Sequence, residues 1–194
     1  MLPYQLAGKI IAGAFLHYPL MLHAFEGKSE AERKKGILQL HTHCARACAQ
    51  YGGIIITPDE QGALVWLNGK NFPLGLMREI ESGMVAIPFK LGVKTTLRLV
   101  NHDAVPEGWI KKNAPENFGY IWNIGVTGNE RGKGYGRLLD EQSITEMRAQ
   151  GINEFFLKTE DPQNVTIYQK LGFEIVYETV VKSSRQRSWV LKRK

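Results

Sequence analysis

Apolar residues recur at steps of three and four along the first fifty positions, which is the period of an amphipathic helix. We expect a helix over residues 5–26, interrupted at Pro19 because proline lacks the N–H that would continue it. A second helix is predicted over residues 29–51, since Ser29 is followed three residues later by Glu32, the spacing of a capping box. Two glycines then end this helix.

Short runs of β-branched and aromatic residues, separated by turn-forming residues, predict strands in the remainder of the chain. The first two runs, residues 54–57 and 63–67, flank a turn-like segment and form a predicted hairpin. Further strands are expected at residues 118–126, 154–159, 173–181 and 188–192. Helices are expected at residues 134–149 and 162–171.

The segment between the hairpin and the strand at 118–126 has a weaker pattern. Residues 74–94 are expected to be helical in short pieces, and residues 95–100 fit either a strand or the end of a helix. We expect a loop over residues 104–117, because two prolines and a glycine interrupt them. The mixture of helices and strands predicts an α/β fold: a mixed sheet flanked by helices in a single domain, residues 1–194.

Composition narrows the class of protein. An apolar fraction of 43% with four Trp and eight Phe is typical of a globular domain. We expect no membrane association, because no apolar run approaches the roughly 20 residues of a membrane span. The first residues lack the features of a secretory signal, and Cys44 and Cys48 are four apart, a poor spacing for a disulfide. A reduced, cytoplasmic location is therefore expected.

A glycine-rich stretch near the middle of the chain carries the clearest chemical signal. It follows the strand ending at Val126, reads Arg131-Gly-Lys-Gly-Tyr-Gly136, and precedes a predicted helix. The N–H groups of a first helical turn have no backbone partners, and the helix dipole adds positive charge there. Glycines let a bulky anion approach, so the stretch predicts a phosphate or pyrophosphate site.

Two common phosphate motifs do not fit this stretch. The dinucleotide fingerprint G-x-G-x-x-G would need glycine where Arg137 stands. The P-loop needs four residues between its first glycine and Gly-Lys, whereas only three separate Gly128 from Gly132-Lys133.

The stretch resembles instead the R/Q-x-x-G-x-G/A signature of the GCN5-related N-acetyltransferase (GNAT) superfamily. A second segment, Asn164-Val-Thr-Ile-Tyr168-Gln-Lys-Leu-Gly172-Phe173, resembles the N-x-x-x-Y-x-x-x-G-F segment of that family. The resemblance covers about residues 54–194. It implies a GNAT-like sheet that is mostly antiparallel, with acetyl-CoA as acyl donor, and N-terminal helices at about 5–51 that shape the acceptor site.

The resemblance also implies roles for particular residues. Tyr168 would be the acid that protonates the leaving thiolate. The base is selected from position in the chain and not from the resemblance: we select Glu160, after the strand at 154–159, with Asp161, Glu116, His102 and a water chain as alternatives. Cofactor contacts are implied for Ile124, Gly125, Val126, Arg131, Gly132, Lys133, Gly134, Tyr135, Gly136, Asn164 and Tyr168.

His41, Cys44 and Cys48 would share one face of a helix, and zinc accepts these residue types. The C-x-x-C spacing of a zinc site is absent, so we expect core packing and no metal. The strand containing Trp66 resembles a hairpin that faces the acceptor in one branch of the family, but a core tryptophan is the preferred interpretation.

The combined prediction is an N-acetyltransferase that moves an acetyl group from acetyl-CoA to a primary amine of a small molecule by direct attack. Two alternatives stay open: a non-catalytic acyl-CoA-binding sensor, and an enzyme that acts on protein or peptide amines. Homodimer formation is also left open. The net charge is +6, and six basic residues lie between Lys182 and Lys194. We do not expect a nucleic-acid partner, because no aromatic stacking platform accompanies them.

Overall fold

A six-stranded sheet forms the centre of the molecule, as seen in the computed structural model, which describes all residues, 1–194. The strand order is β1-β2-β3-β4-β6-β5, and every neighbouring pair is antiparallel except β3 and β4. The strands are β1 (Gly52–Ile56), β2 (Gly62–Asn68), β3 (Gly119–Val126), β4 (Phe155–Thr159), β5 (Glu174–Val181) and β6 (Gln186–Arg193). The predicted mixed, mostly antiparallel α/β fold is confirmed.

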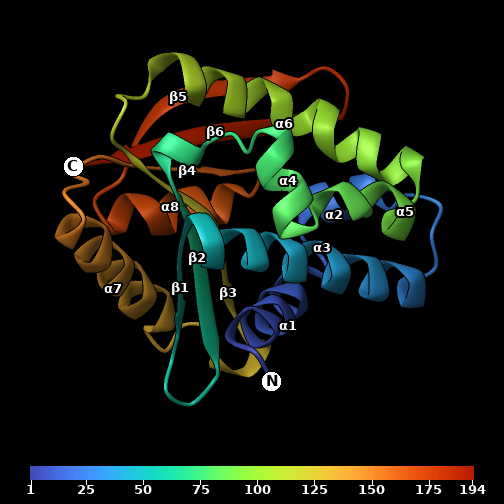
Figure 1. Cartoon of the computed structure of the whole chain (residues 1–194), viewed down its shortest axis with the longest axis horizontal. Coiled ribbons are helices and arrows are strands. Elements are labelled where there is room, and N and C mark those ends of the chain that lie inside the picture. The colour runs from blue at the N-terminus through green and yellow to red at the C-terminus, as the bar shows by residue number, and fades with distance from the viewer.

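Helices cover both faces of this sheet (Figure 1). One face packs against α1 (Pro3–Phe15), α3 (Glu30–Tyr51) and α6 (Val93–Asn113). The other face packs against α7 (Tyr135–Ala149) and α8 (Pro162–Lys170). The shorter helices α2 (Pro19–Ala24), α4 (Leu76–Ser82) and α5 (Ile87–Leu91) lie beyond the sheet, with 3-10 turns at Gly69–Asn71, Met84–Ala86 and Gly128–Glu130. No helix is both long enough and apolar enough to cross a bilayer.

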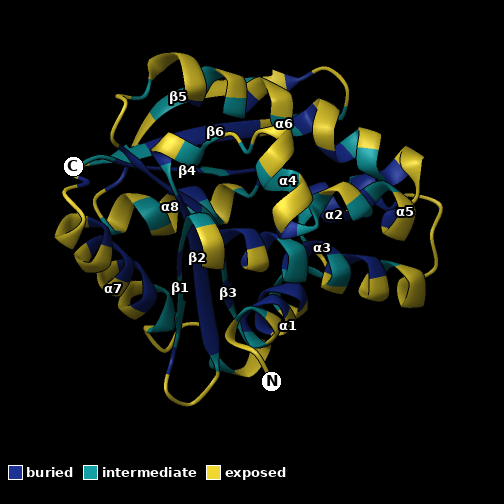
Figure 2. Ribbon diagram, in the orientation of Figure 1, coloured by how far each residue is buried: buried dark blue, intermediate teal, exposed yellow.

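Burial follows this layering: β2, in the interior of the sheet, is dark blue in Figure 2, whereas the residues of the edge strand β5 are mostly intermediate or exposed. Trp66, Tyr120, Phe155 and Phe156 are fully buried between the sheet and its helices. Trp66 therefore belongs to the core, as preferred from the sequence. The aromatic and β-branched residues that predict strands thus also supply the apolar area that holds the helices in place.

The predicted helix starts are confirmed. Ser29 accepts from the Glu32 N–H and Glu32 accepts from the Ser29 N–H at 2.8 Å, so the capping box begins α3. Pro19 separates α1 from α2 and stands in the first turn of α2. The two glycines after α3 do not form a left-handed cap; they continue directly into β1.

The predicted loop over residues 104–117 is wrong for residues 104–113 and is confirmed only for residues 114–117, and the strand alternative for residues 95–100 is wrong. Residues 95–100 and 104–113 belong to α6, which contains Pro106 within it. The buried residues Thr95, Leu99, His102, Pro106 and Ile110 follow one another at steps of three and four, so they form a helical face. Burial of this face outweighs the single hydrogen bond that Pro106 cannot donate.

The sheet divides between β3 and β4. These parallel strands pair only through Gly119 with Phe155 and Tyr120 with Phe156. Beyond Tyr120 the residues of β3 have no partner strand on the β4 side. β3 also contains a bulge, because Val65 pairs with Asn123 and Trp66 with Ile121, which leaves Trp122 without a partner on β2. Unpaired backbone groups in the middle of a sheet mark a place where a ligand can pair.

Candidate active site

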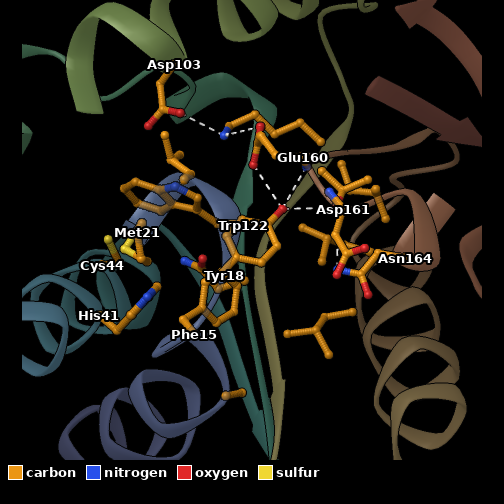
Figure 3. Close-up of a pocket in the computed structure, with 18 of the residues that line it drawn as sticks. Phe15, Tyr18, Met21, His41, Cys44, Asp103, Trp122, Glu160, Asp161 and Asn164 are labelled. Atoms are coloured by element: carbon orange, nitrogen blue, oxygen red, sulfur yellow. Dashed lines mark hydrogen bonds and ion pairs between the residues drawn. The ribbon is translucent and has the colours of Figure 1, made fainter. Parts of the chain in front are cut away.

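A cavity of about 1100 Å³ lies at this division of the sheet. The loop before α7 forms one end, and side chains from α1, α2 and α3 form the other (Figure 3). Between the ends, its walls are β3, the C-terminal part of β4, and α8. The cavity therefore joins the predicted phosphate site to the N-terminal helices that were expected to shape the acceptor site.

The phosphate loop has the geometry that the sequence predicts. Gly132 and Gly134 adopt φ values of +81° and +91°, and no atom lies within 4 Å of the position that a Cβ would take at either residue. Gly134 is the N-cap of α7 and supplies no side-chain acceptor, so the first N–H groups of α7 remain free. This arrangement suits an anion such as pyrophosphate.

The charged residues of the loop are held by local contacts. The Arg131 guanidinium donates to the Ala14 carbonyl oxygen at 3.1 Å, beside the end of α1. Lys133 pairs at 2.9 Å with Glu130, which lines the cavity, but Lys133 itself is not part of the lining. Tyr135 donates to Asp59 in the β1–β2 turn. Arg131 and Tyr135 line the cavity together with the glycines, so five of the six predicted loop residues meet there.

The predicted strand contacts come from the unpaired part of β3. Ile124 and Val126 line the cavity. Gly125 faces α1 instead: a Cβ there would stand 2.6 Å from the Ile11 Cα. Glycine at this position therefore allows α1 to pack directly on the strand, while the backbone of Gly125 remains in the unpaired stretch.

Asn164 and Tyr168 project from α8 into the same cavity. They lie one helical turn apart, and the ring of Tyr168 packs edge-on against Phe173 at 5.9 Å. Burial, together with the carboxylates of Asp140 and Glu160, raises the pKa of Tyr168 above its ordinary value. The phenol is therefore protonated at neutral pH, as an acid for a leaving thiolate must be.

Glu160 is at the centre of a buried hydrogen-bond network. Its carboxylate accepts from Tyr18 Oη at 2.9 Å, His102 Nε2 at 3.1 Å and Ser188 Oγ at 3.1 Å, and it pairs with Lys158 at 3.3 Å. Burial alone would raise the pKa of Glu160, but Lys158 and the hydrogen bonds lower it to about 2. The group is ionised and its oxygens are occupied, which is a poor condition for a general base at neutral pH.

The other candidate bases are dispersed. His102 is buried in the Glu160 network and does not line the cavity. Glu116 is exposed in the loop before β3 and lies outside the cavity. Asp161 lines the cavity, where it caps α8 by accepting from the Gln163 N–H at 2.9 Å.

Replacing Glu160 by glutamine should destabilise the fold by about 3 kcal/mol at pH 7, because buried Lys158 and His102 lose a charged partner. The folded pKa of about 2 lies below the ordinary 4.5, so the carboxylate stabilises above pH 4.5 and this contribution disappears as the pH falls through 2. Denaturant unfolding of both proteins between pH 7 and pH 2 measures the difference, which should shrink over that range. Glu154→Gln, which breaks a partly exposed pair with Lys192, is the control and should cost less than about 1 kcal/mol. Equal costs for the two substitutions would contradict the buried-network interpretation.

Sequence analysis missed several residues of this cavity. Tyr18 reaches the Glu160 network from the α1–α2 junction, and its hydroxyl also accepts from the Glu160 N–H at 2.8 Å. Asp103 and Glu107 stand one turn apart on α6 and line the cavity. Burial and nearby Asp103 raise the pKa of Glu107 to about 8. The helical spacing of α6 was the signal that could have located these two carboxyl groups.

The cysteine and histidine face of α3 divides between cavity and core. His41 and Cys44 line the cavity, whereas Cys48 packs into the core cluster between the sheet and α1. Burial raises the pKa of both thiols, which are not joined to each other. No group of three potential metal ligands occurs in the structure.

Comparison with known proteins agrees with this geometry. The model of the acetyltransferase (GNAT) family matches residues 94–173. An uncharacterised N-acetyltransferase of Schizosaccharomyces pombe is 23% identical over 192 residues, which cover 96% of this chain and 76% of the relative.

Two solved structures share the fold along nearly the whole chain. The polyamine N-acetyltransferase of Drosophila melanogaster has a TM-score of 0.62 at 15% identity, covering 98% of this chain and 93% of that one. A mosquito arylalkylamine N-acetyltransferase-like protein has a TM-score of 0.55 at 13% identity, covering 91% and 89%. The two solved structures show the shared fold, while the family model over residues 94–173, the N-acetyltransferase relative, the glycine loop and the α8 motif support assignment of the chain to the acetyltransferase (GNAT) family.

Proposed function

We propose that this protein transfers an acetyl group from acetyl-CoA to the primary amine of a small molecule, by direct attack of the amine on the thioester. The observation that carries the proposal is the single cavity that connects a free helix N-terminus to an acceptor pocket through the unpaired part of β3. A long, flexible donor with phosphates at one end and a thioester at the other fits such a path.

The residues present suit acetyl-CoA. The N–H groups at the start of α7 and the Arg131 guanidinium would hold the pyrophosphate. The unpaired backbone of Ile124, Gly125 and Val126 would hydrogen-bond the pantetheine arm, and Asn164 would contact the donor from α8. A backbone N–H in the unpaired part of β3 would polarise the thioester carbonyl.

The chemical step needs two proton transfers. As the C–N bond forms and the C–S bond breaks, the Tyr168 hydroxyl would give its proton to the departing thiolate. The proton that the amine loses would pass to water in the cavity. Glu107 could take it up only in the minority of molecules in which it is ionised at neutral pH, because its pKa is raised to about 8. Glu160 would act indirectly, since it holds Tyr18 and Lys158 in the wall of the site.

The shape and charge of the acceptor end favour a small amine over a protein chain. Side chains from α1, α2, α3 and α6 line it on several sides. Asp103, which pairs with Lys158 at 2.7 Å, and Glu107 give it carboxyl groups that can hydrogen-bond an amine. Both Drosophila and mosquito relatives are named for small amines, which supports the same choice.

Incubation with acetyl-CoA and a panel of primary amines tests this function. We expect free CoA thiol to appear together with the N-acetylated amine, identified by mass spectrometry. The N,N-dimethyl form of each amine is the matched control, because it has no N–H to lose and cannot give a stable amide. Thiol release that is independent of added amine would indicate hydrolysis and would contradict the proposal.

A further inference from the structure

His41 is a buried histidine without a hydrogen-bond partner at the acceptor end of the cavity. Its side chain is 2% exposed, and neither ring nitrogen has a partner within the chain. Buried polar groups are paired in the great majority of cases, because an unpaired one lowers stability. The ring lines the cavity wall on α3, and Figure 3 shows it directed towards Phe15 and Tyr18. An unpaired, buried imidazole in a binding cavity points to a ligand that completes its hydrogen bonds.

The surroundings of His41 are apolar and aromatic. The Phe15 ring packs on the imidazole with centroids 4.6 Å apart, and Tyr18 packs on Phe15 at 4.8 Å. Met21 and Trp122 complete this part of the wall. Burial lowers the pKa of His41 to about 3, and no charged group contributes to that shift. The imidazole is therefore neutral, with one nitrogen able to donate and the other able to accept.

The apolar surroundings of His41 limit which ligand group can hydrogen-bond its imidazole. An ammonium group would lose its hydration here without gaining an opposite charge, and a carboxylate would lose it likewise. A hydroxyl group is neutral and can both donate and accept, which matches the imidazole. The aromatic walls suit a flat apolar body that carries the hydroxyl.

We propose that His41 determines acceptor specificity by hydrogen-bonding a hydroxyl group on the aromatic body of the acceptor amine. The inference rests on the proposed amine acetylation and adds the class of acceptor: a hydroxylated arylalkylamine, as opposed to a diamine. Both ring nitrogens are covered by neighbours in the free protein. The acceptor therefore has to displace a covering side chain, and half-buried Phe15 is the ring that packs on His41.

The test compares 2-phenylethylamine with its 4-hydroxy counterpart at saturating acetyl-CoA. We expect the parent protein to favour the hydroxylated amine by about 10-fold or more in kcat/KM, since a site built to hydrogen-bond a hydroxyl rejects an analogue without it. His41→Leu should reduce this ratio to about 2-fold or less, with little loss for 2-phenylethylamine. His41→Gln, which keeps a donor and an acceptor, should retain part of the ratio. Cys44→Ala changes the adjacent wall without removing a hydrogen-bonding group of comparable strength, so it should keep the full ratio.

If His41 serves only the packing of the core, we expect different results. The ratio would then be near one in the parent, or equal in the parent and in His41→Leu, and either result overturns the inference. A preference for 1,5-diaminopentane that His41→Leu leaves unchanged would overturn it as well. If no amine of the whole panel is acetylated, the proposed function fails, but calorimetric binding of the two phenylethylamines to the CoA complex still decides the inference. About 10-fold tighter binding of the hydroxylated amine to the parent alone supports it, and equal binding overturns it.

Discussion

Replacing Gly134 by glutamate should abolish measurable acetyl-CoA binding, with a loss in affinity of about 100-fold or more. Gly134 has φ +91°, which an L side chain rarely adopts, and its Cβ would point into open space at the phosphate end of the cavity. The new carboxylate would stand where the pyrophosphate is expected and would repel it. A ligand at 100 times its dissociation constant stabilises a protein by about 2.7 kcal/mol, so the melting temperature of the parent should rise with acetyl-CoA and that of the variant should not.

Two further variants separate charge from backbone strain. Gly128→Glu places the same carboxylate in the same loop but outside the cavity lining, and it should bind acetyl-CoA normally. Gly134→Ala keeps the strain of the positive φ without the charge, so it should lose stability more than affinity. Normal acetyl-CoA affinity in Gly134→Glu would remove the phosphate-site assignment.

Replacing Tyr168 by phenylalanine should lower kcat by about 10² or more while the dissociation constant of acetyl-CoA changes by less than about 3-fold. The substitution removes one hydroxyl proton and leaves the ring packing on Phe173 in place. Steady-state kinetics, together with calorimetric titration of acetyl-CoA, measures both quantities. Tyr177→Phe is the control, because Tyr177 stacks on Trp109 outside the cavity lining.

The pH profile gives a second measurement of the same role. An acid works only while it is protonated, and burial raises the pKa of Tyr168 above the ordinary value of 10.0. The kcat of the parent should therefore show no alkaline decline attributable to this residue below pH 10. A fall in kcat centred near pH 8 that disappears in Tyr168→Phe would contradict the raised pKa. Unchanged turnover in the variant would assign the proton to water or to another acid.

The sequence was most informative where local chemistry fixes the conformation. The capping box at Ser29, the first-turn proline of α8 and the left-handed glycines before α7 each depend on a few adjacent residues. The loop prediction failed for residues 104–113 because it counted prolines and ignored the apolar period, whereas residues 114–117 do form a loop. Pro106 lies on the buried face of α6, where packing compensates for its missing hydrogen bond.

The site depends on contacts that local patterns do not encode. Tyr18 and Glu160 lie 142 positions apart and meet only because α2 packs near the end of β4. Glu160 was selected as a base from its place after a strand, but Lys158 and its hydrogen bonds give it a low pKa in spite of its burial. His41 follows the apolar pattern of α3, and only the folded chain reveals that its nitrogens are unpaired. Burial and partners come from tertiary packing, and they change the chemistry of a side chain without changing its identity.

The division of the sheet has a consequence for how the protein stays folded. Two half-sheets, β1-β2-β3 and β4-β6-β5, are joined along their strands by only two residue pairs. A donor lying between them would occupy the position of a missing strand and connect the halves through its own hydrogen bonds. Bound donor would then set the fraction of molecules whose two half-sheets are held together, so the protein should open locally at this division more often without donor than with it.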